Sequence, residues 1–188
     1  RRVLFRSTQP STPHLRLSHP WHATPMRALV QRVRGCEVRV QGERISGFTG
    51  PGLLVLVGVT HEDSATIASK LADKVAGLRI FEQRHASPTG PAGPTNAREL
   101  SVSDLHLPAM VVSQFTLYAD TRKGRRPTWD DAAPRTIAEP LVDGFVRALE
   151  NFGVTVETGR FGADMMVDFS NDGPMTVMLE VNDPAGRR

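Results

Sequence analysis

From residue 26 onward, the apolar positions either alternate with polar ones or run together in short stretches. Residues 28–33 and 36–40 are valine-rich with polar residues between, which predicts two strands joined tightly at Arg34-Gly35. Residues 53–59 form a continuous apolar run bounded by glycine, proline and charged residues, which is typical of a strand buried on both faces. The shorter run at 78–81 indicates a further strand.

Two other segments repeat apolar residues at helical spacing. Asp63 or Ser64 can cap the first helix, and the second has Pro134 or Pro140 in its first turn and ends at Gly153. The apolar stripes are Ile67, Leu71, Val75 and Leu78 in the first helix, and Ile137, Leu141, Phe145, Leu149 and Phe152 in the second.

The rest of the chain is predicted to form strands and one long loop. Proline and glycine are so frequent in residues 85–96 that we expect a loop there. Further strands are predicted at 110–118, 154–158, 165–170 and 175–181. About eight strands and two helices predict one α/β domain of the mixed α+β kind over residues 26–181, with a curved, barrel-like, mainly antiparallel sheet.

The first 25 residues differ from the rest in composition. They hold four arginines, several prolines and no acidic residue, so we expect a disordered extension, either vector-derived or upstream sequence before Met26, or a targeting segment. Residues 182–188 are expected to be a short tail. Without the four arginines, 19 basic and 20 acidic residues remain, so the pI of 9.6 is no argument for a nucleic-acid binder.

Few residues suggest familiar catalytic chemistry. No apolar run approaches the ~20 residues of a membrane helix, and the single cysteine, Cys36, fits a reducing compartment, so we expect a cytoplasmic protein. His61, His85 and His106 lack metal-ligand spacing, and no phosphate-binding or dinucleotide fingerprint occurs, so no metal or cofactor is expected. Cys36 is expected to be buried and inert, and residues 61–63 to be capping residues.

Two short motifs have a distinctive amino-acid sequence. Residues 113–117 read SQFTL, and strand alternation would put Ser113 and Phe115 on one face and Gln114 and Thr116 on the other. Taken alone, this motif indicates only a strand with a half-polar face. Residues 171–176 read NDGPMT, which is typical of a turn between two strands, although the proline removes a ladder donor and permits a cis bond.

Together the two motifs resemble the D-aminoacyl-tRNA deacylase (D-tyrosyl-tRNA deacylase) family, whose signatures are SQFT before a hydrophobic residue and NxGPxT near the C-terminus. The resemblance covers roughly residues 26–181 and includes ADTRKGRRP at 119–127 and TGRFGADM at 158–165. The chain departs from the family pattern in a longer proline- and glycine-rich loop at 86–94 and in the residues at 97–99.

The resemblance implies a homodimer that hydrolyses the ester between tRNA and a D-amino acid, or glycine mischarged onto alanine tRNA, and spares L-aminoacyl esters. Gly173 and Pro174, joined by a cis bond, would reach into the pocket of the other subunit and leave no room for an L side chain. Ser113 would line the same pocket, and Phe161 would seat the terminal adenine of the tRNA.

The catalytic residues implied by the resemblance are Gln114, Phe115 and Thr116. The N–H groups near Phe115 and Thr116 are candidate oxyanion donors, and the water would be activated by the 2′-hydroxyl of the substrate's own ribose. Thr116 is open to two interpretations, nucleophile or pocket wall. The wall is favoured because the sequence predicts no histidine or lysine beside the hydroxyl.

A basic loop suggests how tRNA would be held. Its cations, which we expect to contact phosphates, are Arg122, Lys123, Arg125 and Arg126. An alternative is a non-catalytic RNA-binding module that uses this loop. One tyrosine and two tryptophans offer little for base stacking, which argues against that alternative. A general serine or threonine esterase would lack its base.

Overall fold

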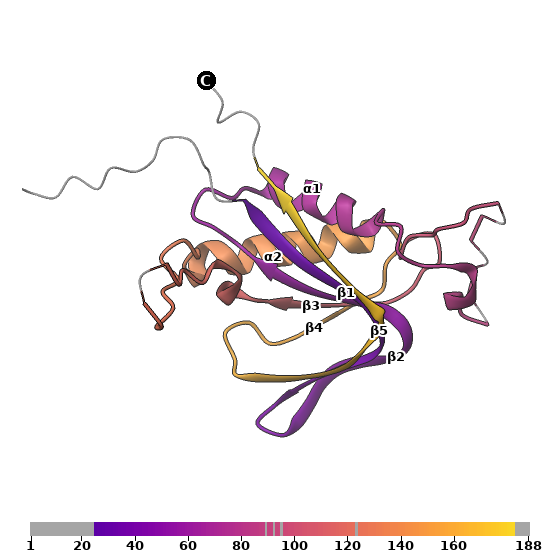
Figure 1. Cartoon of the computed structure of the whole chain (residues 1–188), viewed down its shortest axis with the longest axis horizontal. Helices are drawn as coiled ribbons and strands as arrows, with labels where there is room; N and C mark the ends of the chain where they lie inside the picture. The colour runs from indigo at the N-terminus through magenta and orange to yellow at the C-terminus, as the bar shows by residue number, and fades with distance from the viewer. Residues whose placement is uncertain (1–24, 89, 92, 95, 123, 183–188) are drawn as a thin grey trace, which may run out of the picture.

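The computed structural model describes residues 25–182 except 89, 92, 95 and 123, so nearly all of the predicted extension and tail lies outside it. Two helices, α1 and α2, two short 3-10 helices, η1 and η2, and the strands β1 to β5 make up the described part (Figure 1). Their bounds are β1 Met26–Val40, β2 Glu43–Gly58, α1 Ala65–Ala76, η1 Gln83–His85, β3 Ala109–Ser113, η2 Phe115–Tyr118, α2 Arg135–Asn151, β4 Val156–Thr158 and β5 Met165–Val181.

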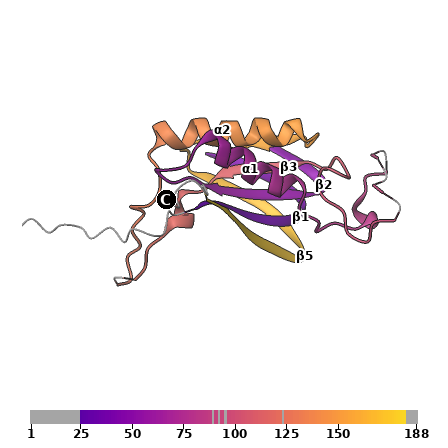
Figure 2. The same cartoon turned by 90° about the horizontal axis from the view of Figure 1, so that it is seen from above.

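The strands form one open, curved sheet in the order β4-β3-β2-β1-β5. The long ladders of β1 with β2 and β5 are antiparallel, while β2–β3 and β3–β4 are short parallel ladders. Both helices cover the same face of this sheet (Figure 2). The predicted mixed α/β domain with a mainly antiparallel sheet is confirmed, but the sheet is not closed, and β4 and β5 are its edges.

Both predicted helices are present, although Leu78 lies beyond the end of α1 and Phe152 is the C-cap of α2. Ser64 caps α1, since its hydroxyl accepts a hydrogen bond from the N–H of Ile67 at 3.4 Å. Pro134 is the N-cap of α2, so Pro140 lies inside that helix instead of opening it. Gly153 follows the helix end with a φ of +78°, a left-handed conformation that glycine adopts without strain. None of the described helices has the length and hydrophobicity needed to cross a membrane.

The predicted breaks within the long strands are wrong. Residues 28–33 and 36–40 belong to one strand, because a bulge at Gly35, with a φ of +85°, bends β1 without ending it. Residues 165–170 and 175–181 likewise belong to one strand, β5. Hydrogen bonding to β1 on either side of residues 171–176 keeps this segment within the strand, so it is not a hairpin turn.

Two further strand predictions need correction. Residues 78–81 contribute only an isolated bridge, between Phe81 and Leu100. The strand predicted at 110–118 ends at Ser113, where the chain turns into the 3-10 helix η2. The side chains after Ser113 therefore do not alternate across the sheet as a strand would require.

A second, smaller apolar cluster lies on the face of the sheet opposite the helices. Leu53 and Val55 of β2 pack toward the helices, whereas Leu54 packs with Cys36 and Met110 in this cluster. The predicted burial of residues 53–59 on both faces and of Cys36 is thereby confirmed. Burial, followed by the negative charge of Asp168, raises the pKa of the Cys36 thiol to about 11.

Candidate active site

The SQFT segment lies at the carboxyl end of β3, where the sheet gives way to η2. Ser113 is the last residue of the parallel ladder with β2 and is level with Val57. The N–H of Gln114 donates to the Val57 carbonyl at 2.7 Å, and the chain then turns. As a result, Ser113, Gln114 and Thr116 are half-buried, while the Phe115 side chain is 56% exposed.

The N–H groups of Phe115 and Thr116 open η2. The first N–H groups of a helix have no acceptor within that helix, and the Gln114 side chain does not cap them. Instead, the Gln114 side-chain amide donates a hydrogen bond to the hydroxyl of Thr116. An amide is not a general base, so this contact favours the wall role for Thr116 over the nucleophile role.

The carboxyl-terminal end of η2 is firmly anchored. The Tyr118 hydroxyl is buried and lies 2.8 Å from the Gly58 carbonyl and 2.9 Å from that of Pro25. Arg27 donates to the Leu117 carbonyl at 2.9 Å, and its guanidinium lies 5.0 Å from the centre of the Tyr118 ring. Desolvation strongly raises the pKa of Tyr118, so its hydroxyl stays protonated and keeps donating a hydrogen bond.

The NDGPMT segment protrudes from the edge strand β5. Thr176 pairs with Gln31 and Asn171 with Val33, so the four residues 172–175 of β5 stand opposite the single residue Arg32 of β1. Asn171 spans the protrusion, because its side chain accepts from the N–H of Met175 at 3.1 Å and donates to the Thr176 hydroxyl at 3.0 Å.

The backbone of the protrusion differs in one respect from what the resemblance implies. Gly173 has a φ of +110°, a region that L side chains rarely adopt, so glycine is the residue that fits there. No described peptide bond is cis, so the expected cis bond between Gly173 and Pro174 is wrong for this structure.

Within one chain, the two motifs do not meet. Ser113 is level with Val57, whereas Gly173 is near Arg32, which pairs with Leu53. Four residues along the strands and three strand spacings across the sheet correspond to about 20 Å. The resemblance implies that Gly173 and Pro174 reach into the pocket of the other subunit, which stays a prediction; within one chain they are too far from Ser113 to line its pocket.

Phe161 and the basic loop occupy different surroundings. Phe161 is half-buried against the main core, and the guanidinium of Arg135 lies 5.6 Å from its ring centre. Arg122, Arg125 and Arg126 are exposed on a loop that a bridge between Asp120 and Thr128 closes. Arg122 also donates two side-chain hydrogen bonds to Asp120, at 2.9 and 2.7 Å. Lys123 lies outside the described residues.

An aromatic pair beside this loop was missed by the sequence reasoning. The rings of Phe115 and Trp129 meet edge to face with centres 5.6 Å apart, and the Trp129 side chain is 38% exposed. Counting aromatic residues over the whole chain could not reveal that two of them meet next to the SQFT segment.

The predicted capping role of residues 61–63 is wrong, because the N-cap of α1 is Ser64; the Asp63 carboxylate instead accepts from the N–H of Thr60 at 2.7 Å, in the turn before the helix. His61 instead contacts the Asp130 carbonyl at 3.1 Å. No group of three or more histidine, cysteine, aspartate or glutamate side chains within the described ranges is arranged to hold a metal ion.

Comparison with known proteins gives a consistent result. The family described as D-Tyr-tRNA(Tyr) deacylase matches residues 29–180. A curated relative from Cutibacterium acnes, named D-aminoacyl-tRNA deacylase, is 52% identical over 158 residues, which cover 84% of this chain and 99% of the relative. A relative of the same name from Streptomyces coelicolor is 52% identical over 156 residues, or 83% of this chain and 100% of the relative.

Among solved structures, one titled c-Myc DNA unwinding element binding protein has a TM-score of 0.71 and 33% identity, covering 84% of this chain and 99% of that one. The shared fold defines a class of small mixed α/β proteins with an open sheet backed by two helices. Within that class, the chain belongs to the D-Tyr-tRNA(Tyr) deacylase family.

Proposed function

We propose that this protein hydrolyses the ester that joins a D-amino acid to the 3′-terminal ribose of tRNA and releases free tRNA and the D-amino acid. The family match and relatives named D-aminoacyl-tRNA deacylase support the reaction. The structural observation that carries the proposal is the opening of η2, where the N–H groups of Phe115 and Thr116 begin a helix directly after a buried strand.

These N–H groups would receive the ester carbonyl oxygen. As the oxygen of a water attacks the carbonyl carbon, negative charge develops on that carbonyl oxygen, and two fixed donors stabilise it by hydrogen bonds. The bond between the carbonyl carbon and the ribose oxygen then breaks, and a proton passes to the ribose oxygen. The 2′-hydroxyl of the same ribose would accept the proton of the water and pass its own proton to the departing ribose oxygen, so no side-chain base is required.

In this proposal, Gln114, Thr116 and Ser113 shape the pocket. The hydrogen bond from Gln114 orients the Thr116 hydroxyl, which then forms part of the wall beside the donors. Phe161, whose ring faces the guanidinium of Arg135, would help to seat the terminal adenosine. Glycine has no side chain to exclude, so glycyl-tRNA would also be a substrate.

Chirality would be read by Gly173 and Pro174 of a second copy in a homodimer. Two observations support this arrangement. The two motifs are separated by about 20 Å within one chain, and the edge strand β5 exposes the apolar side chains Met166, Phe169 and Met178. A clash with rigid backbone discriminates strongly, because an L side chain has no flexible neighbour to displace.

The acceptor end of tRNA would lie over the basic loop and the Phe115–Trp129 pair. Arg125 and Arg126 would contact phosphates, and the exposed aromatic rings offer a surface on which a base can stack. Since its substrate arises during translation, the protein would work in the cytoplasm.

Deacylation of matched D- and L-tyrosyl-tRNA by the purified protein tests the proposal directly. We expect rapid release of D-tyrosine and none of L-tyrosine above the spontaneous rate, together with a dimer in sedimentation. Equal rates on both substrates, or no rate on either, would refute the proposed reaction.

The second candidate is a nucleic-acid-binding module without catalysis. The exposed aromatic pair beside the basic loop favours it, and a neighbour of the same fold is titled as a DNA-element binding protein. Tight binding of uncharged tRNA without any hydrolysis of D-tyrosyl-tRNA would favour this module over the deacylase.

A further inference from the structure

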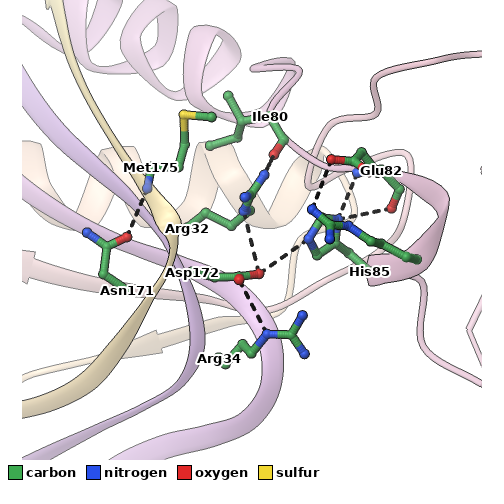
Figure 3. A network of polar contacts seen from close by, with 9 residues as sticks. Arg32, Arg34, Ile80, Glu82, His85, Asn171, Asp172 and Met175 are labelled. Carbon is green, nitrogen blue, oxygen red and sulfur yellow. Dashed lines mark hydrogen bonds and ion pairs between the residues drawn. The ribbon is translucent and has the colours of Figure 1, made fainter.

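A buried cluster of charged and polar side chains includes Asp172, the residue before Gly173 (Figure 3). Arg32 comes from β1, Asp172 from β5 and His85 from the end of η1, so the cluster joins three segments that are far apart in the sequence. His85 has no exposed surface, and Arg32 is 6% exposed. Buried polar groups are costly unless they are paired. Among the described residues, Nε of Arg32, Nε2 of His85 and Oδ2 of Asp172 make no hydrogen bond, so they stabilise one another through close electrostatic contacts.

The orientation of the His85 ring follows from its hydrogen bonds. Its Nδ1 accepts a hydrogen bond from the N–H of Glu82 at 2.8 Å, closer than its 3.2 Å contact with the Glu82 carbonyl. The proton of the neutral ring is therefore on Nε2. That nitrogen lies 3.3 Å from Oδ2 of Asp172 (Figure 3). Desolvation and the charge of Arg32 lower the pKa of His85, so the ring is neutral near pH 7.

Asp172 is the centre of the cluster. Its Oδ2 lies 3.6 Å from Nε of Arg32, and its Oδ1 lies 3.4 Å from Nε of Arg34. Burial acts to raise the pKa of Asp172, but the hydrogen bond and charge of Arg34, then the charges of Arg32 and His85, lower it overall. The carboxylate is therefore ionised, and Nε2 of His85 lies beside its buried oxygen at 3.3 Å.

The cluster touches the protrusion itself. A Cβ built on Gly173 would lie 2.5 Å from Nη2 of Arg32, so the backbone of Gly173 packs directly against this guanidinium. Arg32 also donates to the Ile80 carbonyl, just before η1. Any movement of Asp172 or Arg32 is therefore transmitted to Gly173 and Pro174.

We propose that His85 is a positioning residue that holds the Gly173–Pro174 protrusion in place through Asp172. This inference rests on the proposed function, in which the protrusion excludes L-aminoacyl esters. His85 touches no substrate in this arrangement. It acts through the close contact of its Nε2 with the Asp172 carboxylate, from the segment that leads into the proline- and glycine-rich loop.

Three variants test the proposal. His85→Leu removes the donor and keeps an apolar volume, His85→Gln places an amide donor where Nε2 lies, and Arg84→Gln changes the neighbouring exposed residue of η1 as the control. The readout is the ratio of single-turnover rates on D- and L-tyrosyl-tRNA. We expect the ratio to fall about 10- to 100-fold in His85→Leu, the range for a misplacement of about 1 Å, to recover in His85→Gln, and to be unchanged in Arg84→Gln.

An unchanged ratio in folded His85→Leu would overturn the proposal, and so would a loss that His85→Gln does not restore, because His85 would then act by packing alone. If His85→Leu does not fold, Asp172→Asn takes its place and is expected to lower the ratio similarly. Where His85→Leu does fold, adding it to Asp172→Asn should lower the ratio no further than Asp172→Asn alone, since His85 acts through Asp172.

A second readout separates this proposal from the proposed function. The amide resonance of Gly173 in protein labelled with ¹⁵N-glycine should shift or broaden in His85→Leu and return in His85→Gln. If the wild-type protein hydrolyses neither ester, the proposed function has failed, and this resonance alone decides the positioning role. An unmoved resonance overturns it.

Discussion

The side-chain amide of Gln114 donates a hydrogen bond to the hydroxyl of Thr116. This contact occupies the hydroxyl with a donor that cannot remove its proton, while the Gln114 side chain leaves the N–H groups at the start of η2 uncapped. In the proposed reaction, the backbone would stabilise the developing charge and the side chains would give the pocket its shape.

Thr116→Ala should therefore retain substantial activity. The change removes a hydroxyl from the wall but leaves both main-chain donors in place. We therefore expect the single-turnover rate on D-tyrosyl-tRNA to fall no more than about tenfold. Removing a general base costs about 10²–10⁴-fold, and removing a nucleophile costs more. A variant with no activity above the spontaneous rate, but correctly folded and dimeric, would identify Thr116 as the nucleophile.

Gly173→Ala should reduce both activity and stability. The added methyl group would lie 2.5 Å from Arg32, at a φ of +110° that alanine rarely adopts. We expect a loss of about 1–3 kcal/mol in the free energy of unfolding and a slower reaction on the D-ester, measured by chemical denaturation and by single turnover.

Gly50→Ala is the matched control for that change. Gly50 also has a positive φ, +84°, but nothing lies within 4 Å of a Cβ built there. Gly50→Ala therefore measures the stability lost by placing alanine at a positive φ, without the clash that Gly173→Ala adds. If Gly50→Ala and Gly173→Ala lose the same stability and Gly173→Ala keeps its D/L selectivity, the close packing of Gly173 on Arg32 has no functional role.

Neutralising Arg125 and Arg126 to glutamine should weaken tRNA binding and its dependence on salt. Each lost phosphate contact is expected to reduce the slope of log K against log salt by roughly 0.7–0.9. Filter binding or anisotropy with uncharged tRNA from low to high salt measures the slope. Arg147→Gln on the exposed face of α2 serves as the control, and equal slopes for all three proteins would show that the loop is only solvated.

The buried thiol of Cys36 predicts a pH dependence of stability. Its pKa is raised from 9.0 to about 11 in the folded protein, so the unfolded chain loses the proton first as the pH rises. The thiol's contribution is complete below about pH 9 and is lost between about pH 9 and 11, by up to roughly 2–3 kcal/mol. Urea unfolding of the wild type and of Cys36→Val across that range should show the smaller decline in the variant; parallel curves would contradict the prediction.

Much of the secondary structure follows from local pattern. The stripes ending at Leu78 and Phe152, with Ser64 and Pro134 at the starts, predict both helices because helical periodicity and capping are properties of a few neighbouring residues. The buried run at 53–59 also follows from local composition. The two signature motifs could also be recognised in the sequence, because each occupies consecutive positions.

The tertiary structure decided whether strands continue and which distant residues meet. Gly35 and residues 172–175 look like turn residues, yet β1 and β5 pass through them because pairing continues on both sides. The turn after Gln114 depends on the Val57 carbonyl of another strand. His85 and Asp172 are 87 positions apart, and only the packing of η1 against the bulge of β5 brings their side chains to 3.3 Å. Local sequence carries polarity and backbone preference, whereas partners across the sheet are set by the fold as a whole.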